Sequence, residues 1–278
     1  MLDDSSVSTV RLDGLVASSA PMVFASMALR TERTMFFILK DADEAGYFYH
    51  DLTQVMGQEN VLYFPSSYRR AVKYGQRDAA SEILRTEVLA EVKRRSQGAE
   101  RGVKSHDYNQ EQISCNKSEQ TSSLSTLSSS LFIVSYPEAI AELVVSRRRL
   151  ESRTLELVAD QTVNVTDVMK TLREFGFREV EYVYEPGQFA LRGSILDVYS
   201  YSCEYPFRID FFGDDIDSIR TFEVDTQLSR ERRTTVQIVP ELAGITEDRV
   251  SLFSFLTADT VVVMKDGSDI RYAVGRTY

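Results

Sequence analysis

The chain has 278 residues, of which 43% are hydrophobic and 10% aromatic, and this length suits two or three domains better than one. Its net charge of −10, from 32 basic and 42 acidic residues, disfavours contact with phosphate backbones, so we expect a protein partner rather than bare nucleic acid. No apolar run is long enough to span a membrane and no basic, apolar leader opens the sequence, which argues against a membrane partner and predicts a cytoplasmic location.

The first 150 residues alternate short apolar runs with helical patterns. The runs at 35–39, 60–64 and 131–134 predict strands that are buried on both faces. Helices are expected at 17–30, 41–52, 79–93 and 137–150. The last of these helices would end in three arginines, which suit the negative end of a helix dipole. Strands that alternate with helices imply an α/β fold with a parallel sheet.

A polar insertion interrupts this pattern at about 94–130. Ser, Gln, Glu and Lys dominate it, and apolar periodicity disappears. Such a composition buries too little apolar surface to offset the entropy of ordering. We therefore expect a surface insertion that is partly disordered.

The pattern changes again after residue 151, where a small α+β domain is predicted over 151–236. A helix at 166–175 would be capped by Thr166 and followed by Gly176. Strands are expected at 179–184, 188–192, 194–199, 206–212 and 217–224. Apolar runs at 236–239 and 260–264 resemble the strands of the first segment. We therefore expect 237–278 to return to the α/β domain of 1–150, with the small domain inserted between the two parts.

A phosphate-binding loop would be expected at the start of the first helix, but its chemistry is absent. The G-x-x-x-x-G-K-[ST] loop uses glycines for close backbone approach, Lys for phosphate charge and Ser or Thr for Mg²⁺. Counted from Gly14, the second glycine is replaced by Ser19, the lysine by Ala20 and the metal ligand by Pro21. We therefore expect no nucleotide and no other cofactor.

Other catalytic arrangements are also missing from the sequence. His50 and His106 are the only histidines, and the two cysteines, Cys115 and Cys203, have no partner at metal-ligand spacing. The acidic cluster Asp214, Asp215 and Asp217 could hold a metal, but Gly-Asp-Asp after a strand favours a hairpin turn. No catalytic or metal-binding residue is assigned.

The strand at 206–212 carries the most informative pattern. Alternation places Phe207, Ile209 and Phe211 on a core face and Arg208, Asp210 and Phe212 on the other face. An aromatic residue on the polar face is unusual.

The strand at 188–192 turns Arg192 outward in the same way. If the two strands are neighbours, Arg192, Arg208 and Phe212 share one exposed patch suited to protein binding. The alternative is that Arg208 pairs with Asp210 or Glu181 and that Phe212 packs under the following turn.

These strands carry a family resemblance. The segments EPGQFALRGSILDVY (185–199) and YPFRIDFFGDDIDSIR (205–220) resemble the signature of the transcription-repair coupling factor family, Mfd. The match covers about 164–240 closely and 1–150 loosely. The resemblance implies a split, degenerate ATPase-like domain with an inserted domain that recruits the repair ATPase UvrA. The family surface of two arginines and a phenylalanine corresponds to Arg192, Arg208 and Phe212.

The resemblance leaves two alternatives open. UvrB, a repair helicase subunit that binds ATP and damaged DNA, shares a looser version of the signature, but it resembles a working ATPase with an intact phosphate loop. Weak DNA affinity could also come from two arginine clusters, at 147–149 and at Arg230, Arg232 and Arg233. Full-length family members also bind RNA polymerase and double-stranded DNA and act as translocases. We expect this chain to be an amino-terminal, non-catalytic fragment of such a protein.

Overall fold

The computed structural model describes residues 9–15, 18–28, 30–31, 33–68, 78–100 and 130–277. These residues divide between two compact units. The first lies within Met1–Pro65, Arg94–Ala141 and Leu256–Tyr278, and the second within Ser66–Lys93 and Glu142–Phe255. The boundaries expected at 151 and 237 therefore both fall inside the second unit. The polar insertion lies mostly outside the described residues.

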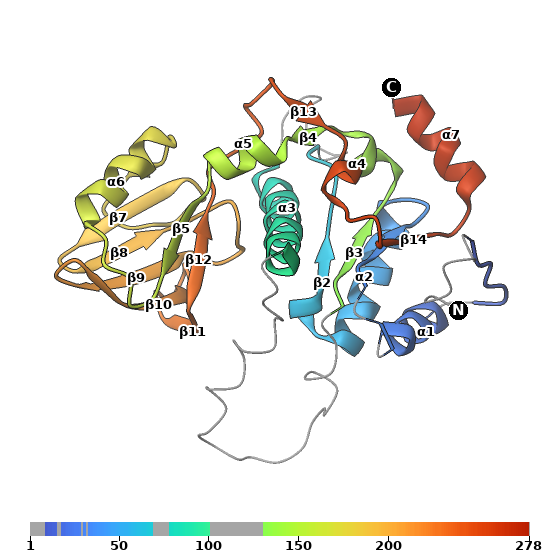
Figure 1. Cartoon of the computed structure of the whole chain (residues 1–278), viewed down its shortest axis with the longest axis horizontal. Coiled ribbons are helices and arrows are strands. Elements are labelled where there is room, and N and C mark those ends of the chain that lie inside the picture. Colours follow the sequence, from blue (N-terminus) through green and yellow to red (C-terminus); the bar gives the residue numbers. More distant parts are fainter. Residues whose placement is uncertain are drawn as a thin grey trace, which may run out of the picture. The chain divides into compact units, whose positions relative to one another are not determined.

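The first unit is built on a four-stranded, wholly parallel sheet in the order β14-β1-β3-β2, so the predicted α/β class is confirmed (Figure 1). Its strands are β1 (Met35–Ile38), β2 (Val61–Tyr63), β3 (Phe132–Ser135) and β14 (Val261–Met264). Its helices are α1 (Ser19–Ala28), α2 (Ala42–Met56), η1 (Gln58–Asn60), α4 (Pro137–Ala141) and α7 (Gly267–Thr277). Every residue of β1 and β3 is buried, as strands covered on both faces require.

An aromatic cluster joins α1 and α2 to this sheet. The Phe37 ring of β1 lies 5.0 Å from the Phe24 ring of α1 and 4.9 Å from the Phe48 ring of α2, measured between centroids. Such contacts add to the burial of large rings. The apolar runs read from the sequence therefore form the core of this unit.

The helix predicted at 137–150 is wrong, because a strand divides it. The segment contains α4, then β4 (Val144–Val145), then α5 (Arg147–Ser152). β4 pairs with β13 (Arg249–Val250), and Ser146 caps α5 by accepting a hydrogen bond from the Arg149 amide. The three arginines therefore begin a helix instead of ending one. The Arg147 guanidinium lies 5.2 Å from the Phe255 ring centroid.

The second unit is dominated by a six-stranded sheet in the order β11-β10-β9-β8-β7-β6. Its strands are β6 (Arg178–Glu179), β7 (Gln188–Arg192), β8 (Ile195–Val198), β9 (Phe207–Phe212), β10 (Asp215–Phe222) and β11 (Ser229–Arg233). All neighbours are antiparallel except β6 and β7. The unit also contains most of α3 (Ala79–Glu100), α6 (Val165–Glu174) and η2 (Leu252–Phe255). The strand predicted at 179–184 is reduced to β6.

Two further differences from the sequence predictions concern the segment near residue 237 and the start of α6. The segment expected to return to the parallel sheet near residue 237 is β12 (Thr235–Ile238), which instead pairs with β5 (Leu155–Val158) in a two-stranded antiparallel sheet. The parallel sheet is completed by β14. The cap of α6 is Asn164, whose side chain accepts from the Thr166 amide, because Thr166 itself lies inside the helix.

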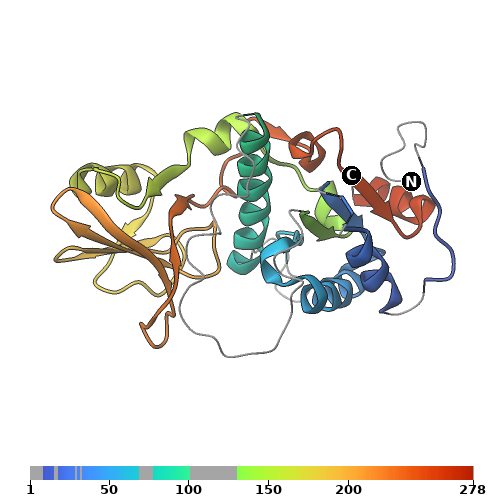
Figure 2. The same cartoon turned by 60° about the horizontal axis from the view of Figure 1, so that its bottom comes forward.

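One face of the six-stranded sheet forms the core of the second unit. α6 runs along this side (Figures 1 and 2) and contributes Val168 and Leu172. The sheet contributes Phe189, Leu196, Val198, Phe207, Ile209, Phe211, Ile216 and Ile219. We call this the inner face and the opposite side the outer face. The outer face carries the alternate residues of the same strands.

Candidate functional site: the outer face of the antiparallel sheet

The three residues predicted to form a patch all project from the outer face. Arg208 and Phe212 alternate with the buried Phe207, Ile209 and Phe211 along β9. Arg192 lies at the end of β7. The strands β7 and β9 are not neighbours, because β8 pairs with both. A residue of β8 therefore lies between the two arginines and connects them.

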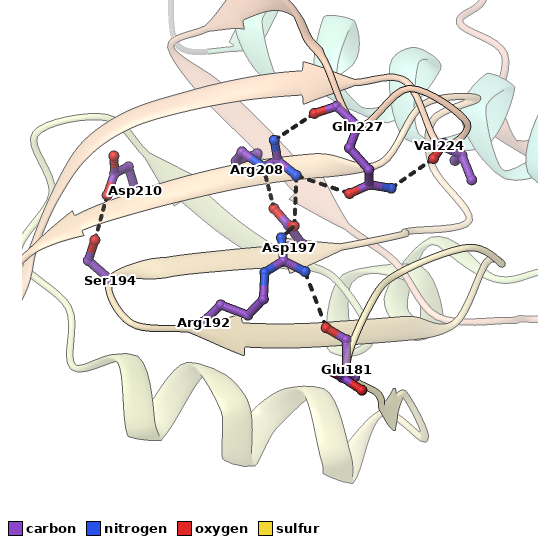
Figure 3. Close-up of polar contacts among 8 residues, drawn as sticks. All are labelled: Glu181, Arg192, Ser194, Asp197, Arg208, Asp210, Val224 and Gln227. Atoms are coloured by element: carbon purple, nitrogen blue, oxygen red, sulfur yellow. Dashed lines mark hydrogen bonds and ion pairs between the residues drawn. The ribbon is translucent and has the colours of Figure 1, made fainter.

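The connecting residue is Asp197 of β8, which is fully buried. One carboxylate oxygen accepts hydrogen bonds from both arginines, at 2.6 Å from Arg192 Nη2 and 3.0 Å from Arg208 Nη2. The other oxygen accepts from Arg208 Nε at 2.8 Å. Figure 3 shows the two guanidinium groups converging on this carboxylate. One buried negative charge thus orders two positive charges, and its three charge-assisted bonds offset its desolvation.

Arg208 also holds the turn between β10 and β11. It donates to the Gln227 carbonyl oxygen at 2.9 Å and to Gln227 Oε1 at 3.3 Å (Figure 3). Gln227 adopts a left-handed backbone with φ 60°, a conformation that a side chain other than Gly keeps only when its surroundings fix it. The Arg208 guanidinium lies 4.3 Å from the Phe222 ring centroid. Contacts with Asp197, Gln227 and Phe222 therefore fix the position of the Arg208 guanidinium.

Arg192 is held less tightly than Arg208. It donates to the Glu181 carbonyl oxygen at 3.2 Å and lies 4.7 Å from the Tyr182 ring centroid. Its side chain is 32% exposed, against 18% for Arg208. The alternative in which Arg208 pairs with Asp210 or Glu181 is wrong, since its carboxylate partner is Asp197.

Phe212 is free of the core, with 82% of its surface exposed. Packing beneath the following turn is therefore also wrong. The hairpin predicted at the acidic cluster is confirmed: Gly213 has φ 66°, and Asp214 and Asp215 accept hydrogen bonds from Asn164 and Thr162. An exposed benzyl ring at a hairpin is the kind of stiff apolar group that anchors protein interfaces.

The structure adds Asp197 and Gln227, which the sequence reasoning missed. Alternation alone places Asp197 on the outer face, between the buried Leu196 and Val198. Its burial depends on the register, which sets it directly opposite Arg208. Only the pairing of strands, not their individual patterns, could have revealed this contact.

Comparison with known proteins assigns this region. Residues 155–243 match the UvrB interaction domain. Arg192, Asp197, Arg208, Phe212 and Gln227 all lie inside that match. The matched residues contain the six-stranded sheet, α6 and the β5–β12 pair.

Curated relatives extend the match. Transcription-repair-coupling factors of Haemophilus influenzae and Escherichia coli are 43% identical over 86 residues and 36% identical over 112 residues, covering 31% and 40% of this chain. That of Bacillus subtilis is 24% identical over 235 residues, or 82% of this chain. The matches span 8%, 10% and 17% of the relatives' own lengths. The resemblance to an amino-terminal UvrB-like module of these factors is confirmed.

The residues that were compared with the phosphate-loop pattern lie in the first unit. Gly14 is in an exposed stretch with φ 82°, Ser19 begins α1, and Ala20 and Pro21 follow in its first turn. No strand precedes α1 within the described residues 9–15. That this chain binds no nucleotide stays a prediction.

The other sequence candidates do not gather into a site. In the part of the chain that the structure describes, no three His, Cys, Asp or Glu side chains are grouped to hold a metal ion, and no helix could cross a membrane. Cys203 is free, and burial raises the pKa of its thiol to about 11. His106 and Cys115 lie outside the described residues.

Proposed function

We propose that this chain is a non-catalytic, cytoplasmic adaptor module of transcription-coupled nucleotide excision repair, and that its outer face recruits UvrA. The match of 155–243 to the UvrB interaction domain supports a protein-binding role. The observation that carries the proposal is Phe212, which is 82% exposed on the same face of the sheet as two ordered arginines. Phe212 would fill an apolar pocket on UvrA, and the arginines would meet its acidic groups.

The first unit has a different place in the proposal. Its parallel sheet would be a degenerate ATPase-like domain that carries the adaptor and binds no ATP. Binding of RNA polymerase and double-stranded DNA, and ATP-driven translocation, would belong to other parts of a longer protein. The relatives are named as coupling factors and are several times longer than the matched region.

Phe212 is the cleanest residue with which to test recruitment. Removing Arg208 would leave Asp197 buried with one partner fewer, so a loss of binding could reflect a damaged fold. Phe212 makes no such internal contact, so its loss acts on the partner alone.

We expect Phe212→Ala to weaken UvrA binding by about 30-fold or more, the effect of removing an interface anchor. Calorimetric titration with purified UvrA measures it. Tyr47→Ala is the matched control, because Tyr47 is an aromatic residue of the first unit that is 77% exposed. Wild-type affinity in Phe212→Ala, or an equal loss in both variants, would contradict recruitment through this face.

A further inference from the structure

Three arginines stand side by side on the outer face. Arg208 of β9 lies directly opposite Arg220 of β10, and Arg220 lies directly opposite Arg232 of β11. Residues that face each other across antiparallel strands project to the same side. We call Arg208, Arg220 and Arg232 the arginine row. Neighbouring strands are about 4.8 Å apart, so the row spans roughly 10 Å across the sheet.

The three arginines of the row have only one carboxylate partner among the described residues. Arg208 takes Asp197, as described above. The Arg220 side chain has one hydrogen bond, from Nη2 to the hydroxyl of Ser218 at 3.1 Å. Arg232 is exposed, and its guanidinium has no hydrogen bond or ion pair to any described residue. The nearest outer-face acid on β9, Asp210, accepts from Ser194 at 3.0 Å instead.

Neighbouring arginines show that this is a property of the row and not of the strand. Arg230 and Arg233, also on β11, pair with Glu223 and Glu231. Among the arginines that the structure describes on this sheet, the two without a carboxylate partner, Arg220 and Arg232, therefore lie opposite each other, in a chain whose net charge is −10.

This arrangement works against folding. Like charges directly opposite each other on adjacent strands are destabilising. Internal contacts hold Arg208 through Asp197, but they give no carboxylate partner to Arg220 or Arg232. A partner that supplies negative charge would offset the repulsion, so the row would be more stable when the partner is bound than when the chain is alone.

We propose that the arginine row extends the recruitment face beyond Arg192, Arg208 and Phe212, with Arg220 and Arg232 receiving acidic side chains of the bound protein. This inference rests on the proposed function and adds the chemistry of the partner: a surface with carboxylates roughly 5 to 10 Å apart, matching the strand spacing. A protein surface fits better than nucleic acid, because Asp215 and Asp217 are exposed on the same strand as Arg220 and would repel a continuous phosphate chain.

The test is a double substitution, Arg220→Gln with Arg232→Gln, in the whole chain. We expect UvrA affinity to fall roughly tenfold at low salt and to depend less on salt than in the wild type. We also expect the double variant to melt at or above the wild-type temperature, because the repulsion is relieved. Loss of affinity through misfolding would lower that temperature.

Arg233→Gln is the matched control. It removes one positive charge from β11, the strand of Arg232, but Arg233 lies opposite the inner-face residue Ile219. It should leave UvrA affinity within about twofold of the wild type, as expected for an exposed pair away from an interface.

The outcomes separate this inference from the proposed function. Weak binding by Phe212→Ala with wild-type binding by the double variant overturns the arginine row and leaves recruitment standing. Wild-type binding by both overturns recruitment itself. If the double variant instead loses affinity for a DNA duplex and keeps it for UvrA, the acidic protein partner is overturned.

Discussion

The two faces of the six-stranded sheet are built from the same strands but differ in burial and charge. Along β9, the inner residues Phe207, Ile209 and Phe211 are buried and apolar, whereas the outer residues Arg208, Asp210 and Phe212 are charged or exposed. The inner face gains stability by removing apolar surface from water. The outer face places like charges abreast and leaves a benzyl ring in solvent. The period of two residues thus puts the apolar core on one face and the proposed binding surface on the other, so we expect Phe211 and Phe212 to be separable by mutation.

Adjacent phenylalanines offer the sharpest test of this separation. Phe211 is 5% exposed and Phe212 is 82% exposed. Phe211→Ala should lower the free energy of unfolding by about 3 to 5 kcal/mol, because it opens a cavity in the core. Phe212→Ala should change it by no more than about 0.5 kcal/mol. Urea denaturation followed by circular dichroism measures both. Similar losses in the two variants would mean that the faces are not distinct.

The outer face is nevertheless not all surface, because Asp197 is as buried as the inner-face Ile209. Asp197→Asn removes the charge shared by Arg192 and Arg208 and turns an acceptor oxygen into a donor. We expect a loss of about 2 to 4 kcal/mol of unfolding free energy, since two partly buried arginines lose their counter-charge. Asp210→Asn is the control, on the same face but with a single serine partner, and should cost less than about 1 kcal/mol. Equal effects in the two urea titrations would remove Asp197 from the centre of the network.

Much of this division was accessible from sequence. The period of two in β9 predicted both faces, and the wholly apolar β1 and β3 predicted a parallel sheet, because in each case local pattern and burial agree. The outward positions of Arg192, Arg208 and Phe212 followed from the same alternation. Their role in binding UvrA stays a prediction.

The rest depends on contacts between distant segments. β11 (SRERR) has no apolar pattern, because all five residues are exposed at a sheet edge, and it is a strand only through its pairing with β10. The helix expected at 137–150 is divided because β4 pairs with β13, about 100 residues later in the chain. The burial of Asp197 and the arginine row both depend on register, which no single strand encodes.

A carboxylate that is only partly buried, Glu87, contrasts with the fully buried Asp197. Unlike Asp197, Glu87 of α3 has mainly acidic neighbours: burial, followed by Glu204 and Glu91, raises its pKa to about 7 from 4.5, and Arg233 only partly opposes this. The folded state therefore binds a proton more tightly than the unfolded state, so stability contributed by protonated Glu87 is present below about pH 4.5 and is lost as pH rises toward 7.

We expect a loss of roughly 2 kcal/mol of unfolding free energy across this window, less than the full pKa shift implies because Glu87 is not completely buried. Urea titrations at a series of pH values measure the loss, and Glu87→Gln should flatten the profile in that window. Glu59→Gln, in the first unit, should leave the profile unchanged. A wild-type profile that persists in Glu87→Gln would place the titrating group elsewhere.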